Sequence, residues 1–414
     1  MKKTIVIGMC LGMGAAFAGD LKAPFSLPSA RVLPKGVRNL SYKNVMATAE
    51  NKYGANGESV VIADPFFKNI TFADVIKGKL DPVDKGAVKQ AMLSIGASET
   101  DSFGQTTGQV NIAATAHVPV FAWGFSSKFT GAIAVPILKS SQNVSTGVIQ
   151  QNQALHDSMK AALTAKGVDF KVAEFDNKMV DPIQSKLEEY GYKRLENEDK
   201  SQLGDIRLVA KYLALDTGAN RIVVSNDLTV PTGKDSDVNE VVDVASGDDQ
   251  WDVGAGVAYD YVLNDYWTIS TDGSYTFQLP DRNPERIPMY SDSKVTPDVD
   301  GNTERDLGDI AAFNAAGKWR YEGVNLGAGY TYQYKSADRY NGNAYASSRY
   351  DMLEQDTVQH MHGVVVTGGY DTMTLFKAKK FPVPLSLTLS HTRVMSGMNV
   401  VNDPITALDF SMFF

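Results

Sequence analysis

The sequence predicts an all-β protein that crosses a membrane as a closed antiparallel β-barrel of about 12 strands, within a range of about 12 to 14. Three observations carry this prediction. The chain closes with a strand that has one apolar face, the other expected strands are long, and the connections between strands are alternately short and long.

The final strand, residues 404–414, places alternate side chains on one face because side chains along a strand repeat every two residues. Leu408, Phe410, Met412 and Phe414 share the face that we expect to meet lipid. This ending resembles that of bacterial outer-membrane barrels, whose last strand ends in Phe and is read by the barrel-assembly machinery. We interpret these four residues as an assembly strand that pairs with the first strand. An ordinary edge strand ending in Phe is the alternative.

Residues 1–18 have the pattern of a secretory signal peptide. Lys2 and Lys3 precede an apolar run, and Ala16-Phe17-Ala18 supplies small residues at the positions that a signal peptidase checks. We expect cleavage after Ala18. Residues 19–35, which contain three prolines, would then form a short periplasmic or luminal segment.

Composition excludes some classes of protein but does not select a fold. Lys and Arg together number 40 against 48 Asp and Glu, a formal net charge of −8, so no nucleic-acid partner is expected. On an outer membrane, acidic loops suggest contact with lipopolysaccharide through divalent cations. The single cysteine, Cys10, lies in the expected signal peptide, so the mature chain should have no disulfide. No later run approaches the ~18 apolar residues of a membrane helix, which leaves a closed barrel as the way to span a membrane.

The expected strands exceed the ~5–6 residues that are usual in globular sheets and suit a tilted membrane strand. In residues 250–262, for example, Trp251 to Tyr261 place large side chains on one face, and Asp252 to Asp260 place small and acidic ones on the other. A soluble β-sandwich with buried aromatic residues is the alternative. The expected strands are residues 36–46, 107–120, 125–137, 205–213, 220–230, 250–262, 266–277, 307–321, 324–335, 358–370, 385–393 and 404–414.

Connection lengths favour the barrel over the sandwich, because only a barrel has short periplasmic turns alternating with long extracellular loops. The short connections are residues 122–124, 214–219, 263–265, 322–323 and 371–384. An even strand number places both termini in the periplasm. The barrel is expected over residues 36–414, with helical extracellular inserts at about residues 47–103 and 140–203.

The two inserts carry helix signals and apolar side chains. Asp81-Pro82 and Asp181-Pro182 each place a cap before a proline at the first helical position, and Gly96 is expected to end the first helix. We predict that the inserts pack on each other and offer an apolar platform that collects substrate from outside. Simple mutual capping of the two inserts is the alternative. The platform residues are Phe66, Phe72, Val75, Ile76, Met92, Leu155, Met159, Ile183 and Leu187.

Alternation also predicts which charged side chains face the lumen, where they would set the charge preference of a permeation path. The alternative is that these charges pair with one another to stabilise the barrel interior. The predicted lumen set is Asp205, Arg207, Lys211, Arg221, Asp227, Asp252, Asp260, Asp272, Lys318, Arg320 and Lys335.

Three short motifs, Gly204-Asp205-Ile206-Arg207-Leu208, Pro231-Thr232-Gly233 and Trp251-Asp252-Val253-Gly254, punctuate strands and loops. In these motifs the chain resembles an outer-membrane β-barrel family linked to phenol meta-pathway degradation, which is similar to FadL/TodX-type channels. The resemblance implies passive uptake of small hydrophobic or amphipathic compounds, such as fatty acids and aromatics, with an N-terminal segment that plugs the lumen. The chain departs from the fatty-acid channels in its short N-terminal segment, which lacks an Asn-Pro-Ala motif, and in its fewer strands.

A general diffusion porin and a structural or adhesive surface barrel are the competing functions. An outer-membrane phospholipase would need a His-x-Ser-Asn motif, but His391 is followed by Thr392 and Arg393. His360 and His362 share a strand face, yet no carboxylates are spaced to complete a metal site. We therefore expect no enzyme activity, no cofactor and no metal. The expected partners are outer-membrane lipid and lipopolysaccharide, small hydrophobic molecules and the barrel-assembly machinery.

Overall fold

The computed structural model describes residues 21, 24, 26–67, 69–71, 73, 82–149, 153–165, 182–291 and 295–414. They belong to two compact units, each described by itself. Unit 1 lies within Met1–Ile62, Asn111–Gln142 and Asn197–Phe414, and unit 2 lies within Ala63–Val110 and Asn143–Glu196. No helix of the described residues has the length and apolar character needed to cross a membrane.

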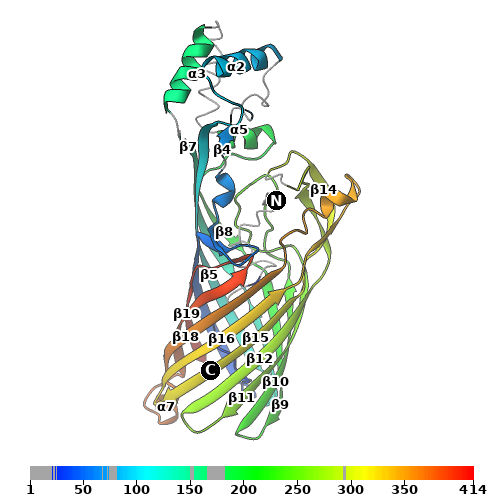
Figure 1. The fold of residues 1–414 in the computed structure, drawn as a ribbon. Coiled ribbons are helices and arrows are strands. Elements are labelled where there is room, and N and C mark those ends of the chain that lie inside the picture. Colours follow the sequence, from blue (N-terminus) through cyan, green and yellow to red (C-terminus); the bar gives the residue numbers. More distant parts are fainter. Residues whose placement is uncertain are drawn as a thin grey trace. The chain divides into compact units, whose positions relative to one another are not determined.

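Unit 1 is a closed antiparallel barrel of 12 strands, several of which lie side by side in Figure 1. Its wall strands are β1 (Arg38–Ala49), the part of β5 (Ser102–Gly124) from Asn111 onward, β6 (Phe129–Ala134), β9 (Ile206–Asp216), β10 (Asn220–Val230), β11 (Asp252–Val262), β12 (Trp267–Gln278), β15 (Ile310–Tyr321), β16 (Val324–Lys335), β18 (Gln359–Asp371), β19 (Leu385–Met398) and β21 (Ile405–Phe413).

Pairing follows the order β1-β21-β19-β18-β16-β15-β12-β11-β10-β9-β6-β5, and β5 pairs back with β1. At the seam between β1 and β21, Asn39 lies opposite Phe413 and Ala47 opposite Ile405. The predicted pairing of the first and last strands is therefore confirmed. Closure gives each of the wall strands a partner on both sides, which a strand-built membrane protein requires.

The sequence predicted the order of all the wall strands, and the turns explain part of this success. Glu322 and Gly323 form a two-residue connection in which both residues have positive φ, 45° and 92°. This backbone is that of the tight turns that join antiparallel strands with the correct twist. The predicted ends were less accurate, since β1 runs to Ala49 and β6 stops at Ala134.

The long connections of unit 1 contain strands and short helices that the sequence analysis missed. Their strands are short and rich in charged residues, so that no two-residue period stands out. One small sheet consists of β13 (Asp281–Arg286), β14 (Val299–Asp306) and β17 (Arg339–Asn341), and another of β2 (Asn51–Tyr53), β3 (Ser59–Val61) and β20 (Val400–Val401). The short helices are α6 (Ser347–Tyr350) and α7 (Met373–Lys377).

The prediction of two helical inserts was only partly right. β7 (Ile137–Ile149) continues as a strand through residues that were expected to be helical, and β8 (Glu198–Leu203) pairs with it at Ile137–Leu203. Backbone pairing between segments distant in sequence overrides a weak local helix pattern. Between Ala63 and Ser102 the described elements are η1 (Asp64–Phe66), β4 (Asn69–Thr71) and α2 (Pro82–Ser94), and the later insert holds α3 (Gln153–Ala165) and α5 (Pro182–Glu189).

Within unit 2, α2 begins at Pro82, as predicted, and stops where Gly96 adopts a φ of 72°. The backbone N–H of Ala97 donates to the carbonyl oxygen of Met92 at 3.1 Å, which closes the end of the helix. Met92 and Met159 are almost fully buried in a cluster that α2 and α3 share. The expected packing of the two helices on each other is thus present.

Candidate functional site

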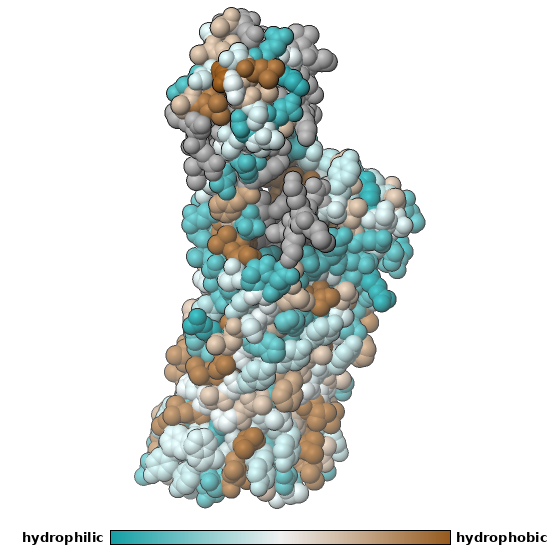
Figure 2. Space-filling model, in the orientation of Figure 1, coloured by the Kyte–Doolittle hydropathy of each residue, from teal (hydrophilic) through white to brown (hydrophobic). Residues whose placement is uncertain are grey.

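The barrel wall has one apolar exposed face and one polar buried face. On β11, Val257 is 52% exposed, whereas Asp260 is 0% exposed. Figure 2 shows mainly brown and pale residues over the wall strands and teal residues over the long connections of unit 1. An apolar outer band of this kind is what a barrel presents to lipid.

A short stretch before β1, residues 21, 24 and 26–36, is called the lumen segment because it contacts the inner face of the wall. The Nζ of Lys318 donates to the carbonyl oxygen of Pro28 at 2.8 Å, and the backbone N–H of Leu33 donates to Oγ1 of Thr130 at 2.8 Å. Thr392 Oγ1 also donates to the carbonyl oxygen of Pro24. These partners come from β15, β6 and β19, which lie apart around the ring. One segment can reach all three only from inside the barrel.

Two apolar side chains hold the lumen segment against the wall. Leu21 is buried among Met361, Val394 and Val400. Leu27 lies over β16, where a Cβ atom added at Gly327 would be only 2.4 Å from Leu27 Cδ1. A Cβ atom added at Gly329 would be 3.0 Å from Cδ2 of the same side chain. The wall is therefore shaped by small residues where the segment crosses it.

Register places the strand members of the predicted lumen set on this same inner face, because each pairs with a neighbour that shares the face. Most have polar partners. The ion pairs are Arg207–Asp227 at 2.7 Å, Arg221–Asp216 at 3.3 Å, Lys318–Asp260 at 3.5 Å, Arg320–Asp371 at 2.8 Å and Lys335–Asp338 at 2.8 Å.

Asp272 accepts a hydrogen bond from Nδ2 of Asn314 at 2.6 Å. Lys211 interacts electrostatically with Asp272 and Asp260. Asp252 lies opposite Thr229 in the pairing of β11 with β10. Pairing of this extent is what the stabilising alternative expects. A role of these charges in permeation remains a prediction.

Asp205 lies just before β9 and is buried in a turn rather than free to meet a solute. Its Oδ1 accepts hydrogen bonds from the backbone N–H groups of Thr232 at 3.0 Å and Gly233 at 2.8 Å. Thr232 Oγ1 donates to the carbonyl oxygen of Gly204 at 2.8 Å, and a Cβ atom at Gly233 would be 2.7 Å from Gly247. Two of the three motifs therefore meet in one tight contact.

The third motif is explained by a close approach between strands. A Cβ atom at Gly254 would be 2.3 Å from Oδ1 of Asp227, the carboxylate that pairs with Arg207. Glycine at this position leaves the space that the ion pair needs. The motifs therefore mark the structure of the β9–β11 wall and of its first long connection.

We expect Asp205→Ala to destabilise the barrel by about 2 to 6 kcal/mol, because two backbone N–H groups lose their acceptor in a buried turn, at about 1 to 3 kcal/mol for each unsatisfied group. Asp205→Asn retains an acceptor oxygen and should lose less. The measurement is the temperature at which the folded barrel loses its heat-modifiable mobility in gel electrophoresis. Asp265→Ala, at an exposed turn residue, is the matched control, and an equal loss in both alanine variants would contradict the prediction.

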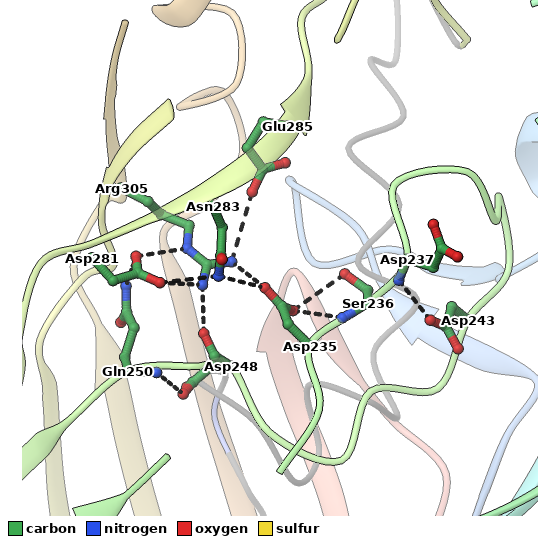
Figure 3. Close-up of polar contacts among 10 residues, drawn as sticks. All are labelled: Asp235, Ser236, Asp237, Asp243, Asp248, Gln250, Asp281, Asn283, Glu285 and Arg305. Carbon is green, nitrogen blue, oxygen red and sulfur yellow. Dashed lines mark hydrogen bonds and ion pairs between the residues drawn. The ribbon is translucent and has the colours of Figure 1, made fainter. Parts of the chain in front are cut away.

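A second polar cluster lies in the long connections of unit 1, around Arg305 on β14 (Figure 3). Arg305 is 5% exposed, and its guanidinium donates to both carboxylate oxygens of Asp281, at 3.0 and 2.7 Å. It also donates to Oδ2 of Asp235 at 2.8 Å and to the carbonyl oxygen of Asp248. Oε1 of Glu285 is 3.6 Å from the same guanidinium. One arginine thus joins the connection after β10 to the connection after β12.

The carboxylates of this cluster outnumber its arginine. Burial, reinforced by Asp235 and Asp281 and opposed by Arg305, raises the pKa of Glu285 from 4.5 to about 7. Asp338 also faces this carboxyl and adds to the same direction. Glu285 therefore holds a proton more tightly in the folded cluster than in an unfolded chain.

It follows that the cluster should lose stability as pH rises from about 4.5 through about 7, because the folded form binds the proton that the unfolded form has lost. We expect the connections at residues 231–249 and 279–306 to resist protease at pH 5 and to be cut faster at pH 8. Glu285→Gln should flatten this dependence. A pH profile that is the same in the wild type and in Glu285→Gln would contradict the assignment.

The platform residues have different positions in the structure. Phe66, Met92, Met159 and Leu187 are buried, whereas Leu155 and Ile183 are partly buried. Phe72, Val75 and Ile76 lie outside the described residues. In this conformation the buried side chains pack within unit 2 and do not contribute to an exposed apolar surface. Substrate collection by these inserts stays a prediction.

The assembly strand has the expected orientation. Leu408, Phe410 and Phe414 are 40%, 43% and 56% exposed on the outer face, which Met412 shares through its pairing with Leu40.

His360 and His362 have ring centroids 5.9 Å apart. Within the described ranges no three His, Cys, Asp or Glu side chains are grouped to hold a metal ion.

Sequence reasoning missed the residues that matter most in these two sites. Arg305 and Asp235 are 70 positions apart, and no local pattern links them. Leu21 and Leu27 gave a weak signal, since they are apolar residues in a proline-rich stretch with neither strand nor helix period. Only the closed ring shows that this stretch has an interior to occupy.

Comparison with known proteins agrees with the three motifs. A family model described as "Putative MetA-pathway of phenol degradation" matches residues 95–353. The chain belongs to this family. The matched range includes all three motifs and both sides of the Arg305 cluster, but not the lumen segment. No protein of curated function matches the chain.

Several solved structures resemble this family member at low sequence identity. The COG4313 outer membrane channel from Pseudomonas putida F1 has 13% identity and a TM-score of 0.49, over 94% of this chain and 100% of that one. The toluene transporter TodX of P. putida has 11% identity and a TM-score of 0.33, over 97% and 93%. A Pseudomonas aeruginosa FadL homologue has 9% identity and a TM-score of 0.30, over 100% and 98%.

Proposed function

We propose that this protein is an outer-membrane channel for passive uptake of small hydrophobic or amphipathic compounds, such as aromatics and fatty acids. The observation that carries the proposal is the lumen segment, whose apolar side chains Leu21 and Leu27 occupy the inner wall. A lumen that seats leucine side chains offers apolar surface to a solute of similar character. Membership of a family described by phenol degradation agrees with this class of solute.

The same observation disfavours the general diffusion porin. A diffusion porin needs an open, wet lumen, whereas here a segment crosses the lumen and binds strands on different sides of the ring. In a structural or adhesive barrel, the lumen segment would stay in the lumen permanently and keep it closed. The proposal differs in requiring that the segment move when a solute passes, and it includes no catalytic step.

The orientation and processing of the chain are part of the proposal. Residues 1–18 would be a signal peptide, the short connections would face the periplasm, and both termini would lie there. The long connections would then face outward, towards lipopolysaccharide. The outer face of β21 would be the surface that the barrel-assembly machinery reads.

Two measurements on the full-length protein test the function. Cells with a lipopolysaccharide-containing outer membrane should take up radiolabelled toluene or oleate faster when they express the protein. In planar bilayers, the purified protein should show small conductance and should not pass sucrose in liposome swelling. Large ohmic conductance with sucrose permeation would establish the porin instead. Neither uptake nor conductance would leave the structural barrel.

A further inference from the structure

The connection between β18 and β19, residues 372–384, is called the lysine turn. It is the longest of the connections at its end of the barrel, yet it is tightly built. The backbone N–H of Thr372 donates to the carbonyl oxygen of Leu385 at 2.9 Å, and Oγ1 of Thr372 donates to the carbonyl oxygen of Val383 at 2.9 Å. The backbone N–H of Leu385 donates back to Thr372 Oγ1 at 2.8 Å. The turn is therefore a closed and ordered structure that contains α7.

The lysine turn presents unbalanced positive charge. Lys377, Lys379 and Lys380 are all exposed, and residues 372–384 include no Asp or Glu. Within the described part of the chain, none of these three lysines makes an ion pair. Phe376, in the same helix, is 41% exposed. Cations beside an exposed aromatic ring are typical of a surface that lies against a membrane.

Aromatic side chains show that the lysine turn lies at a membrane boundary. Tyr370, the last outward residue of β18 before the turn, is 44% exposed. At the same end of the barrel, Trp123 lies 4.5 Å from Phe125, and Trp319 lies 6.1 Å from Tyr321, as ring centroids. Such an aromatic belt marks the level of the lipid headgroups. The lysines lie in the turn that directly follows this aromatic belt.

The positive charge continues onto the neighbouring strands. The backbone N–H of Phe413 donates to the carbonyl oxygen of Pro384 at 3.0 Å, and that of Arg38 donates to the carbonyl oxygen of Phe414 at 2.7 Å. Arg38 therefore starts its strand two positions around the ring from the turn, with its guanidinium 5.5 Å from the centre of the Trp123 ring. The connections after β11 and β15 instead carry acidic residues, Asp265 and Glu322, whereas the connection after β5, the other neighbour of β1, carries the exposed Lys128. The charge at this end is thus asymmetric.

Lys379 has a left-handed backbone conformation, in which a glycine would be less strained. Its φ is 59°, and it follows the end of α7, where the N–H of Lys380 donates to the carbonyl oxygen of Leu375 at 2.8 Å. Glycine is the usual residue in this left-handed position. Stability alone therefore does not explain the side chain at 379.

We propose that the lysine turn binds the headgroups of anionic phospholipids in the leaflet at the short-connection end of the barrel. The lysines and Arg38 provide the charge that a phosphate-rich headgroup needs, and Phe376 provides an apolar contact at the boundary with the acyl chains. The inference goes beyond the proposed function, because it depends on the barrel lying in a membrane and not on what the barrel transports.

The test is native mass spectrometry of the purified full-length barrel in detergent, titrated with cardiolipin or with phosphatidylethanolamine. The wild type should bind cardiolipin at least ten-fold more tightly than it binds phosphatidylethanolamine. Each lysine near an anionic surface contributes about five-fold, so Lys377→Gln with Lys380→Gln should weaken cardiolipin binding about 25-fold. Binding of phosphatidylethanolamine should not change. The matched control replaces two exposed lysines of the long connections, Lys139→Gln with Lys234→Gln, and should retain the preference.

Lys379→Gly separates lipid binding from stability. The backbone should be more relaxed in this variant, so its thermal stability should be equal or higher while cardiolipin binding falls about five-fold. The proposal is overturned if the wild type shows no preference for cardiolipin, if the variants of the lysine turn keep it, or if the control loses it equally. Solute uptake should be unchanged in all of these variants, so a failure of the transport proposal would be seen separately.

Discussion

Removing residues 21–33 is expected to raise the single-channel conductance of this barrel several-fold, because the lumen segment is then absent from the ring that it crosses. The wall itself should remain intact, since its strands pair with one another and not with the segment. The inner face that becomes exposed is lined by ion pairs and small side chains, which water and ions can enter. The measurement is conductance in planar bilayers, with heat-modifiable gel mobility as the check on assembly.

A point variant gives the same test without shortening the chain. In Gly327→Leu the new side chain would occupy the space that Leu27 fills, so the segment must move away from β16. Gly317→Leu is the matched control, because Gly317 lies on the neighbouring strand β15 with no atom within 4 Å of an added Cβ. We expect the conductance to be higher than that of the wild type in Gly327→Leu and unchanged in Gly317→Leu. Unchanged conductance after removal of residues 21–33 would show that the segment does not close the path.

Replacing Arg305 with methionine is expected to cost about 3 to 5 kcal/mol of local stability, which is typical when one partner of a buried ion pair is removed. Asp281 and Asp235 would keep their charges in a largely buried cluster without the guanidinium that binds both. The connections at residues 231–249 and 279–306 should then open. Amide hydrogen exchange and limited proteolysis of these connections are the measurements.

The neighbouring Arg282 provides the control for this prediction. It pairs with Glu304 at 3.0 Å, but the two side chains are 57% and 50% exposed, so Arg282→Met should cost only about 0 to 1 kcal/mol. The barrel strands should stay folded in both variants, because none of their pairings involves Arg305. Equal exchange rates in Arg305→Met and Arg282→Met would contradict the role of Arg305 as the joint between the two connections.

Together these predictions separate two parts of unit 1 with different tasks. We expect the lumen segment to control whether the ring is open, and the Arg305 cluster to control whether the long connections are held together. Glu285 gives the second part a dependence on pH. If transport changes with pH in the wild type but not in Glu285→Gln, then the long connections affect permeation through the barrel.

Local sequence patterns are sufficient to predict the barrel. The two-residue period of strands such as β11 and β16 and the alternation of connection lengths depend only on local chemistry, and both can be read without coordinates. The outward position of Leu408, Phe410 and Phe414 followed from the same period. The inner charged face could be predicted for the same reason, since every second residue of a wall strand must face inward.

The residues that fill the barrel, and those that join its long connections, could not be predicted from local patterns. The contact of Leu27 with Gly327, the pairing of Arg305 with Asp235 and the meeting of Asp205 with Gly233 join residues far apart in the chain. Residues 140–149 were likewise expected to belong to a helical insert. They form part of β7 instead, because the strand that pairs with them lies elsewhere in the sequence. Periodicity reports which face of a strand a residue occupies, but contacts between distant segments depend on how the ring closes, and closure leaves no local pattern.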